Sequence, residues 1–198
     1  MTNTDVTVQE TSGNAAETLA TDVAMLVLRV GLGVVFLGHG LQKLGWFEGG
    51  NYPKSISTQA DFVSFFGYDH TNLMAWLITL TEAISGALLL AGALTPLAVA
   101  GVLGIEFQFI AGVQWSFGLF GDKTGAGGYE VAFMLIGATA ALGFIGAGRF
   151  SVDHLLSWRL RGLRWGLAAI GLALVVGTLV LVGFGLGFGN HPSFPSGR

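Results

Sequence analysis

Several side chains that could do chemistry lie inside or beside segments that are otherwise apolar enough to enter a lipid bilayer. The set contains Arg29, His39, Lys43, Glu82, Glu106, Gln114, Trp115 and Glu130. Placing one ionisable group at the centre of a membrane helix costs about 2.5–3.5 kcal/mol, so each such group calls for a partner or a function. Carboxylates, an imidazole and an amine in such a place could exchange protons, bind a small polar molecule, or pair with one another.

Helix geometry predicts how these side chains are grouped. At about 100° per residue, Arg29, His39 and Lys43 fall within an arc of about 80° on one helix, so the first apolar segment presents a polar face. A rise of about 1.5 Å per residue sorts the set by depth. We expect a central layer of Arg29, His39, Glu82 and Glu106. We expect an outer layer of Lys43, Gln114 and Glu130, with Trp115 beside it.

Each of these residues has a structural interpretation as well. Arg29 and Lys43 lie near helix ends, from which long side chains can extend to the interface. Glu130 begins a segment, where the helix dipole favours a negative charge. Glu82 and Glu106 lie too deep in the membrane to reach the interface or to benefit from a helix end. A second possibility for them is a buried ion pair that only fixes the packing of the helices.

The same residues bear on cofactors. His39 is the sole histidine inside an expected span, and a partner at the outer interface, His70, would be needed for a haem with two histidine ligands; we do not expect one. A quinone site needs a hydrogen-bonding group, a carboxylate for proton exchange and aromatic walls. The residues that could supply these are Phe36, His39, Lys43, Glu82 and Trp115.

The composition predicts an all-α membrane protein. Of the 198 residues, 52% are hydrophobic, 11% are charged and 32 are glycine, whereas about 25% of residues are charged in soluble domains. A spanning helix needs about 20 mostly apolar residues. Five segments qualify, at 23–45, 72–94, 96–118, 129–147 and 166–187. Pro96 suits the first turn of the third segment, so the second and third form a hairpin.

Charge and cysteine content restrict the partners. The arginines between the last two segments are Arg149, Arg159, Arg161 and Arg164. The positive-inside rule places them in the cytoplasm, which puts the N-terminus inside and the C-terminus outside. No basic run suggests nucleic acid. The absence of cysteine excludes iron–sulfur clusters and cysteine-based sulfur chemistry on this chain, and we expect no metal site.

Two further segments are predicted outside the spans. Residues 1–22 carry four acidic and no basic side chains and are expected to form a disordered tail. In the outer loop, Thr58 and Asp61 resemble a capping box, and phenylalanines follow at helical spacing. We expect a short helix over 59–66, which either lies on the outer leaflet or packs on the top of the bundle.

Four blocks of sequence resemble the DoxX family of membrane proteins. They are LRVGLGVVFLGHGLQKL (28–44), FVSFFG (62–67), LTEAISGALLLAGALTPLA (80–98) and GGYEVAFMLIGATAALGFIGAGRFSVDHLL (127–156). This family includes the small subunit of thiosulfate:quinone oxidoreductase and a mycobacterial subunit of a membrane oxidoreductase complex. The resemblance covers about 28–156.

The resemblance implies a four-helix bundle in the bacterial plasma membrane, often associated with redox or respiratory partners. It implies a core at 23–157, with the fifth helix and a short outer tail at 158–198. The polar residues carried over by position are Arg29, His39, Lys43, Glu82, Glu130 and Arg149. Glu106 departs from the pattern, since an apolar residue is expected there.

Three functions stay open. The chain could be an accessory or quinone-contacting subunit of a redox complex, with no covalently bound cofactor. It could be a structural subunit that packs against partner membrane proteins. A carrier for a small molecule or ion has less support, because no inverted repeat is visible.

Overall fold

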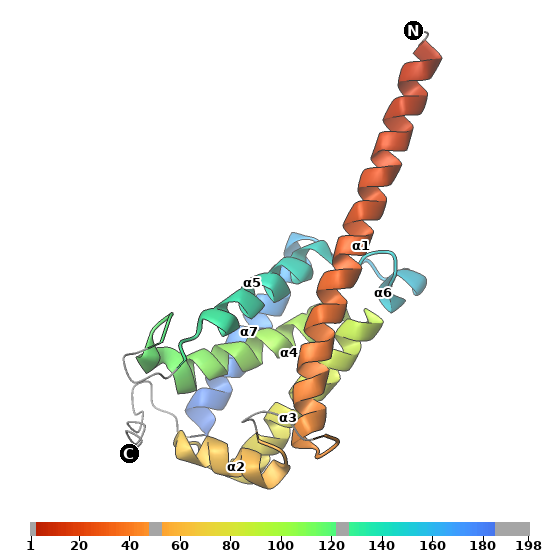
Figure 1. The fold of residues 1–198 in the computed structure, drawn as a ribbon. Helices are drawn as coiled ribbons and strands as arrows, with labels where there is room; N and C mark the ends of the chain where they lie inside the picture. The colour runs from red at the N-terminus through yellow and green to blue at the C-terminus, as the bar shows by residue number, and fades with distance from the viewer. Residues whose placement is uncertain (1–2, 48–52, 122–126, 185–198) are drawn as a thin grey trace.

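The computed structural model describes residues 3–47, 53–121 and 127–184, and these residues contain helices and no strand. Five long helices form a bundle: α1 (Asn3–Lys43), α3 (Thr71–Ala91), α4 (Thr95–Phe109), α5 (Glu130–Ile145) and α7 (Leu163–Gly183). Helix α2 (Ile56–Phe65) lies across one end, and the single turn α6 (Val152–Leu155) lies at the other (Figure 1).

The bundle has the dimensions of a multi-pass membrane protein, which confirms the predicted fold class. Four helices are long and apolar enough to cross a bilayer: Glu17–Lys43, Thr71–Ala91, Thr95–Phe117 and Leu163–Gly183. The remaining apolar helix, α5, has 16 residues and therefore extends about 24 Å, less than the hydrocarbon thickness of about 30 Å. The expected outer end of the last span, beyond 184, lies outside the described residues.

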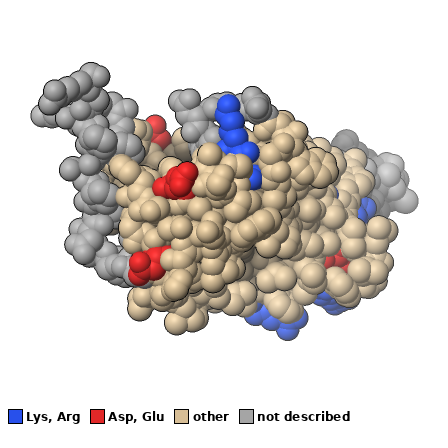
Figure 2. Space-filling model, turned by 90° about the horizontal axis from the view of Figure 1, so that it is seen from below, with Lys and Arg blue, Asp and Glu red and all other residues tan. Residues whose placement is uncertain are grey.

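The surface of the bundle is largely apolar. Large side chains that are more than half exposed include Val27, Phe133, Met134, Leu179 and Val182. Seen from the α2 end, the molecule shows few charged side chains on a broad uncharged surface (Figure 2). Soluble proteins rarely expose apolar patches of this extent, whereas lipid covers them at no cost.

Helices α1 and α3 pack backbone against backbone. A Cβ atom placed on Gly40 would lie 2.6 Å from the backbone nitrogen of Ala83, and one on Gly86 would lie 2.2 Å from the backbone nitrogen of Leu37. No side chain therefore fits at either position, which is the role that small residues have between membrane helices. This contact brings the last turn of α1 directly against the middle of α3.

The hairpin between α3 and α4 forms as the sequence predicts. Gly92 ends α3 with a left-handed conformation (φ 64°), and Pro96 lies in the first turn of α4. Helix α4 does not continue as a regular α-helix to the end of the predicted segment. It is followed by a π-helical turn (Ile110–Gln114) and a 3₁₀ turn (Trp115–Phe117).

Helix α7 packs into the same core as α4 and α5. Gly166 faces the ring of Phe144 on α5, and Gly177 faces the ring of Phe107 on α4, each at a distance that leaves no room for a Cβ atom. Ala169 and Ala173 join the apolar core with residues of α4 and α5. The added helix is therefore integrated with the rest of the bundle.

Two predictions about local structure need correction. Residues 3–22, expected to be disordered, are helical and continue into the first span; extending an existing helix is far less costly than nucleating one, and Figure 1 shows this part of α1 projecting beyond the bundle. Helix α2 begins at Ile56, not 59, because Ser55 is the N-cap and Thr58 is its partner in the capping box. Its buried residues include Val63, which packs with Met74 of α3.

Candidate functional site

The central contact of the candidate site is an ion pair between α1 and α3. The Lys43 ammonium donates a hydrogen bond to the Glu82 carboxylate, and both side chains are only 7% exposed. The sequence placed Lys43 in an outer layer, paired with Glu130 or extended to the interface. That expectation is wrong, because the close approach of Gly40 to Ala83 draws the end of α1 inward until Lys43 reaches Glu82.

Two further ionisable groups lie around this ion pair. Glu106 of α4 is buried and interacts electrostatically with Glu82. His39, one turn before Lys43 on α1, is half-buried and interacts electrostatically with Lys43. We call His39, Lys43, Glu82 and Glu106 the buried polar cluster. In the described part of the chain, Glu106 makes no ion pair, so the cluster holds one lysine against two carboxyl groups.

The remaining outer residues do not join this cluster. Gln114 lies in the π-helical turn, and its side-chain oxygen is buried without a hydrogen-bond partner among the described residues. Trp115 is exposed and stacks on Tyr129, with ring centroids 6.1 Å apart and planes at 6°. Glu130 is exposed at the first position of α5. The predicted outer layer of Lys43, Gln114 and Glu130 is therefore not assembled.

Arg29 also differs from the prediction, since it neither joins a central layer nor reaches toward lipid. It is 2% exposed, and its guanidinium donates hydrogen bonds to the carbonyl oxygens of Ala147 (3.4 Å) and Phe150 (2.5 Å). It interacts electrostatically with Asp153. Arg29 thus fastens α1 to the loop after α5, at the opposite end of the span from Lys43.

Asp153, for which the sequence predicts no role, holds the start of α4 in the structure. Its carboxylate accepts hydrogen bonds from the backbone nitrogens of Leu94 (2.7 Å) and Thr95 (3.0 Å) and from the Thr95 hydroxyl (2.5 Å). These are the free donors at the start of α4, where a negative charge is favoured. The run of small residues before Ser151 and Asp153 is the signal that could have indicated a tight, capping loop.

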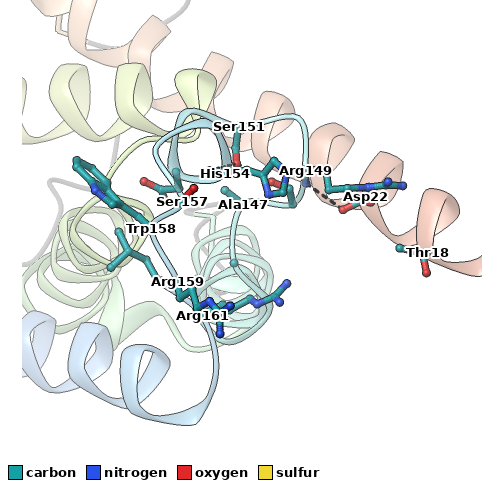
Figure 3. A pocket seen from close by; sticks show the side chains of 14 residues that line it. Thr18, Asp22, Ala147, Arg149, Ser151, His154, Ser157, Trp158, Arg159 and Arg161 are labelled. Atoms are coloured by element: carbon teal, nitrogen blue, oxygen red, sulfur yellow. Dashed lines mark hydrogen bonds and ion pairs between the residues drawn. The ribbon is translucent and has the colours of Figure 1, made fainter.

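A second carboxylate holds the other side of this loop. Asp22 of α1 accepts hydrogen bonds from the backbone nitrogen of Arg149 (2.9 Å) and from its guanidinium (2.5 Å), as Figure 3 shows. The Arg149 side chain is 51% exposed, and Asp22 is 11% exposed. We call Asp22, Arg29, Arg149 and Asp153 the inner-end network. Its members bind mainly to the backbone.

Comparison with known proteins gives one match. Residues 24–115 match the family model DoxX, which covers the spanning part of α1, α2, α3, α4 and the π-helical turn. The matched range contains the whole buried polar cluster, whereas Glu130 and the block at 127–156 lie beyond it. No curated protein and no solved structure matches the chain. The chain is therefore a membrane protein that is similar to the DoxX family over residues 24–115, slightly less than half of its length.

Proposed function

We propose that this protein is an integral subunit of a membrane redox complex, and that its buried polar cluster exchanges a proton with a quinone headgroup. The observation that carries the proposal is the second carboxyl group, Glu106, beside the Lys43–Glu82 ion pair. The redox setting follows from the family resemblance. In the plasma membrane, the arginine-rich end at 149–164 would face the cytoplasm by the positive-inside rule.

The charge balance of the cluster supports proton exchange. Lys43 compensates the charge of one carboxylate, and the desolvation of that pair is offset by its direct contact. Glu106 has no cation of its own in the described part of the chain. Taking up or releasing one proton at Glu106 therefore changes the charge of a site that water does not screen. Ionisable residues in such positions are typical of proton relays in membrane proteins.

The surroundings suggest which part of a quinone each residue would meet. His39 is half-buried and interacts electrostatically with Lys43, so its imidazole would be the group that hydrogen-bonds a quinone oxygen. Phe36, one turn earlier on the same helix, is 1% exposed and would bound the headgroup on its apolar side. Since the chain has no cysteine to hold an iron–sulfur cluster, the electrons released by quinol oxidation would pass to a redox centre on a partner subunit.

The test is the substitution Glu106→Gln, which keeps the shape of the side chain and removes its ability to release a proton. We expect quinol oxidation in membranes to fall about 100-fold, the lower end of the range by which positioned acid–base groups accelerate reactions, while protein abundance stays unchanged. The matched control is Thr139→Val on α5, a buried position whose hydroxyl has no partner in the described residues, and it should change neither quantity. Unchanged oxidation in the Glu106→Gln protein would contradict proton exchange at this site.

A structural subunit is the second candidate, and the complete pairing of Lys43 with Glu82 favours it. In that case His39→Ala and Glu82→Gln would lower protein abundance and leave the activity per molecule unchanged. Gentle detergent extraction followed by identification of co-purifying proteins tests both candidates, because recovery of a lone monomer would contradict any role as a subunit.

A further inference from the structure

We propose that the end of the bundle opposite α2 binds the phosphate group of an anionic membrane lipid. The site is a cavity of about 520 Å³ between α1 at Thr18 and Asp22, the loop after α5 and the segment that leads into α7. Figure 3 shows the side chains that line it. The residues that carry the argument are His154, Ser157, Trp158, Arg159 and Arg161.

The charge of this cavity is positive. Among the described residues there are two ion pairs, Lys43–Glu82 and Asp22–Arg149. Arg159 and Arg161 therefore have no carboxylate partner in that part of the chain, although both line the cavity. The two acidic residues at its wall are already engaged, Asp22 with Arg149 and Asp153 with the start of α4.

The arrangement of donors suits a phosphate. Arginine presents a planar fork of N–H groups that matches phosphate oxygens in a bidentate manner. Figure 3 places Arg159 and Arg161 next to each other on the segment that leads into α7, with Ser157 and Trp158 just before them. Two guanidinium groups and a hydroxyl on one wall provide both charge and hydrogen bonds.

The position of the cavity indicates that the phosphate belongs to a lipid. The cavity lies where α5 has ended at Ile145 and α7 is about to begin at Leu163, which is the level of the headgroups if these helices span the bilayer. Trp158 is partly exposed at its wall, and tryptophan favours this interfacial level. Basic pockets between spanning helices are a recurrent binding mode for anionic headgroups.

The experiment measures lipid binding to the full-length protein in detergent. Phosphatidylglycerol or phosphatidylcholine is titrated in, and native mass spectrometry and the thermal midpoint report binding. We expect saturable binding of phosphatidylglycerol that raises the midpoint, and little effect of phosphatidylcholine. The double substitution Arg159→Gln and Arg161→Gln should weaken phosphatidylglycerol binding about 30-fold, as expected from two basic residues at an anionic surface.

The control is Arg164→Gln. Arg164 belongs to the same basic segment but lies over the ring of Trp165, 5.7 Å from its centroid, and does not line the cavity. The Arg164→Gln substitution should weaken phosphatidylglycerol binding less than about 3-fold, which is less than the loss expected from removing one arginine of the cavity. Because all three arginines are exposed, the variants should fold, and an unchanged midpoint without lipid verifies this. If each arginine removed weakens lipid binding by the same factor in the double variant and in the control, the lipid is attracted by the charge of the surface in general, and the proposed site is overturned.

A further experiment distinguishes the phosphate of a lipid headgroup from free inorganic phosphate. Inorganic phosphate at millimolar concentration should not raise the midpoint of the wild-type protein. A saturable rise with inorganic phosphate that disappears in the double variant would overturn the lipid as the natural occupant. Absence of any preference for phosphatidylglycerol over phosphatidylcholine would overturn the proposal as a whole.

Discussion

The inner-end network and the buried polar cluster both contain buried charged side chains, but these side chains find their partners in different ways. In the inner-end network, Asp153 and Arg29 bind backbone groups of loops and helix ends. In the buried polar cluster, Lys43 and Glu82 bind each other, and Glu106 lies beside them with no ion pair among the described residues.

This difference in partners distinguishes charged groups that hold the fold together from ionisable groups that can gain or lose a proton. A carboxylate that accepts several backbone hydrogen bonds has a fixed geometry, and protonating it would leave donors unpaired. A carboxyl group whose neighbours are other ionisable side chains can change its charge without unmaking a helix end. Type of partner, more than depth of burial, thus distinguishes the two regions.

The largest effect is expected at the inner-end network, from Asp153→Ala. Three donors at the start of α4, two of them buried, would lose their acceptor. Each unpaired buried donor costs about 1–3 kcal/mol, so we expect a loss of about 4 kcal/mol in the free energy of unfolding. Thermal unfolding in detergent measures it. Asp153→Asn keeps one acceptor oxygen and should lose about half as much; a loss below about 1 kcal/mol for the alanine variant would contradict the capping role.

The next effect is expected at the buried polar cluster, from Lys43→Met. Removing one partner of a buried ion pair leaves the other charge uncompensated, which costs about 3 kcal/mol. Adding Glu82→Leu to this variant should restore most of the stability, because an apolar pair replaces the ionic one. Losses that simply add in the double variant would show that the two residues are not coupled.

A smaller effect is expected where the inner-end network meets solvent. Arg149→Ala removes the guanidinium from Asp22 but leaves the hydrogen bond to the Arg149 backbone nitrogen. Since the arginine is half exposed, the loss should be about 1 kcal/mol or less. Chemical denaturation of the variant gives the value, with Arg164→Ala as the control for removing a surface arginine. A loss as large as that of Asp153→Ala would mean that the ion pair itself holds the loop.

The smallest changes in stability are expected when two buried threonines are replaced by valine, and the two changes should have opposite signs. The Thr79 hydroxyl on α3 is buried with no hydrogen-bond partner among the described residues, so Thr79→Val should stabilise the protein by up to about 1 kcal/mol. The Thr95 hydroxyl donates to Asp153, so Thr95→Val should destabilise it by about 1 kcal/mol. Thermal midpoints compare the two variants directly, and equal signs would contradict this assignment of partners.

Much of the fold follows from the sequence because membrane insertion requires long apolar runs. Helices lie over all five predicted segments, and four of them are long and apolar enough to cross a bilayer, whereas α5 is shorter. The hairpin at Pro96 and a short helix at α2 are also present. The expected disorder at 3–22 is wrong because a stable span lets its helix continue into polar sequence.

The grouping of the site residues was harder to predict. Depth along separate helices does not reveal how closely two helices approach, and the glycine contacts between α1 and α3 decide that Lys43 meets Glu82. The π-helical turn at Ile110–Gln114 adds a residue to the α-helical repeat. The depth estimate assumes a regular α-helix, which includes Glu106 but ends before Gln114 and Trp115. The small residues before Asp153 indicate a tight loop, but the sequence does not show which helix that loop caps, so the contact of Asp153 with the start of α4 is not predicted.

The contact of α1 with α3 also has a consequence for the order in which the protein is assembled. These two helices are not consecutive, since α2 lies between them in the chain, so Lys43 enters the bilayer region before Glu82 has been synthesised. Until α3 arrives, the lysine can stay at the interface near the end of α1, and docking of Gly40 against Ala83 then carries it inward. Lys43 can therefore be buried at low cost only once α3 supplies Glu82, so that its charge enters the protein interior as half of an ion pair.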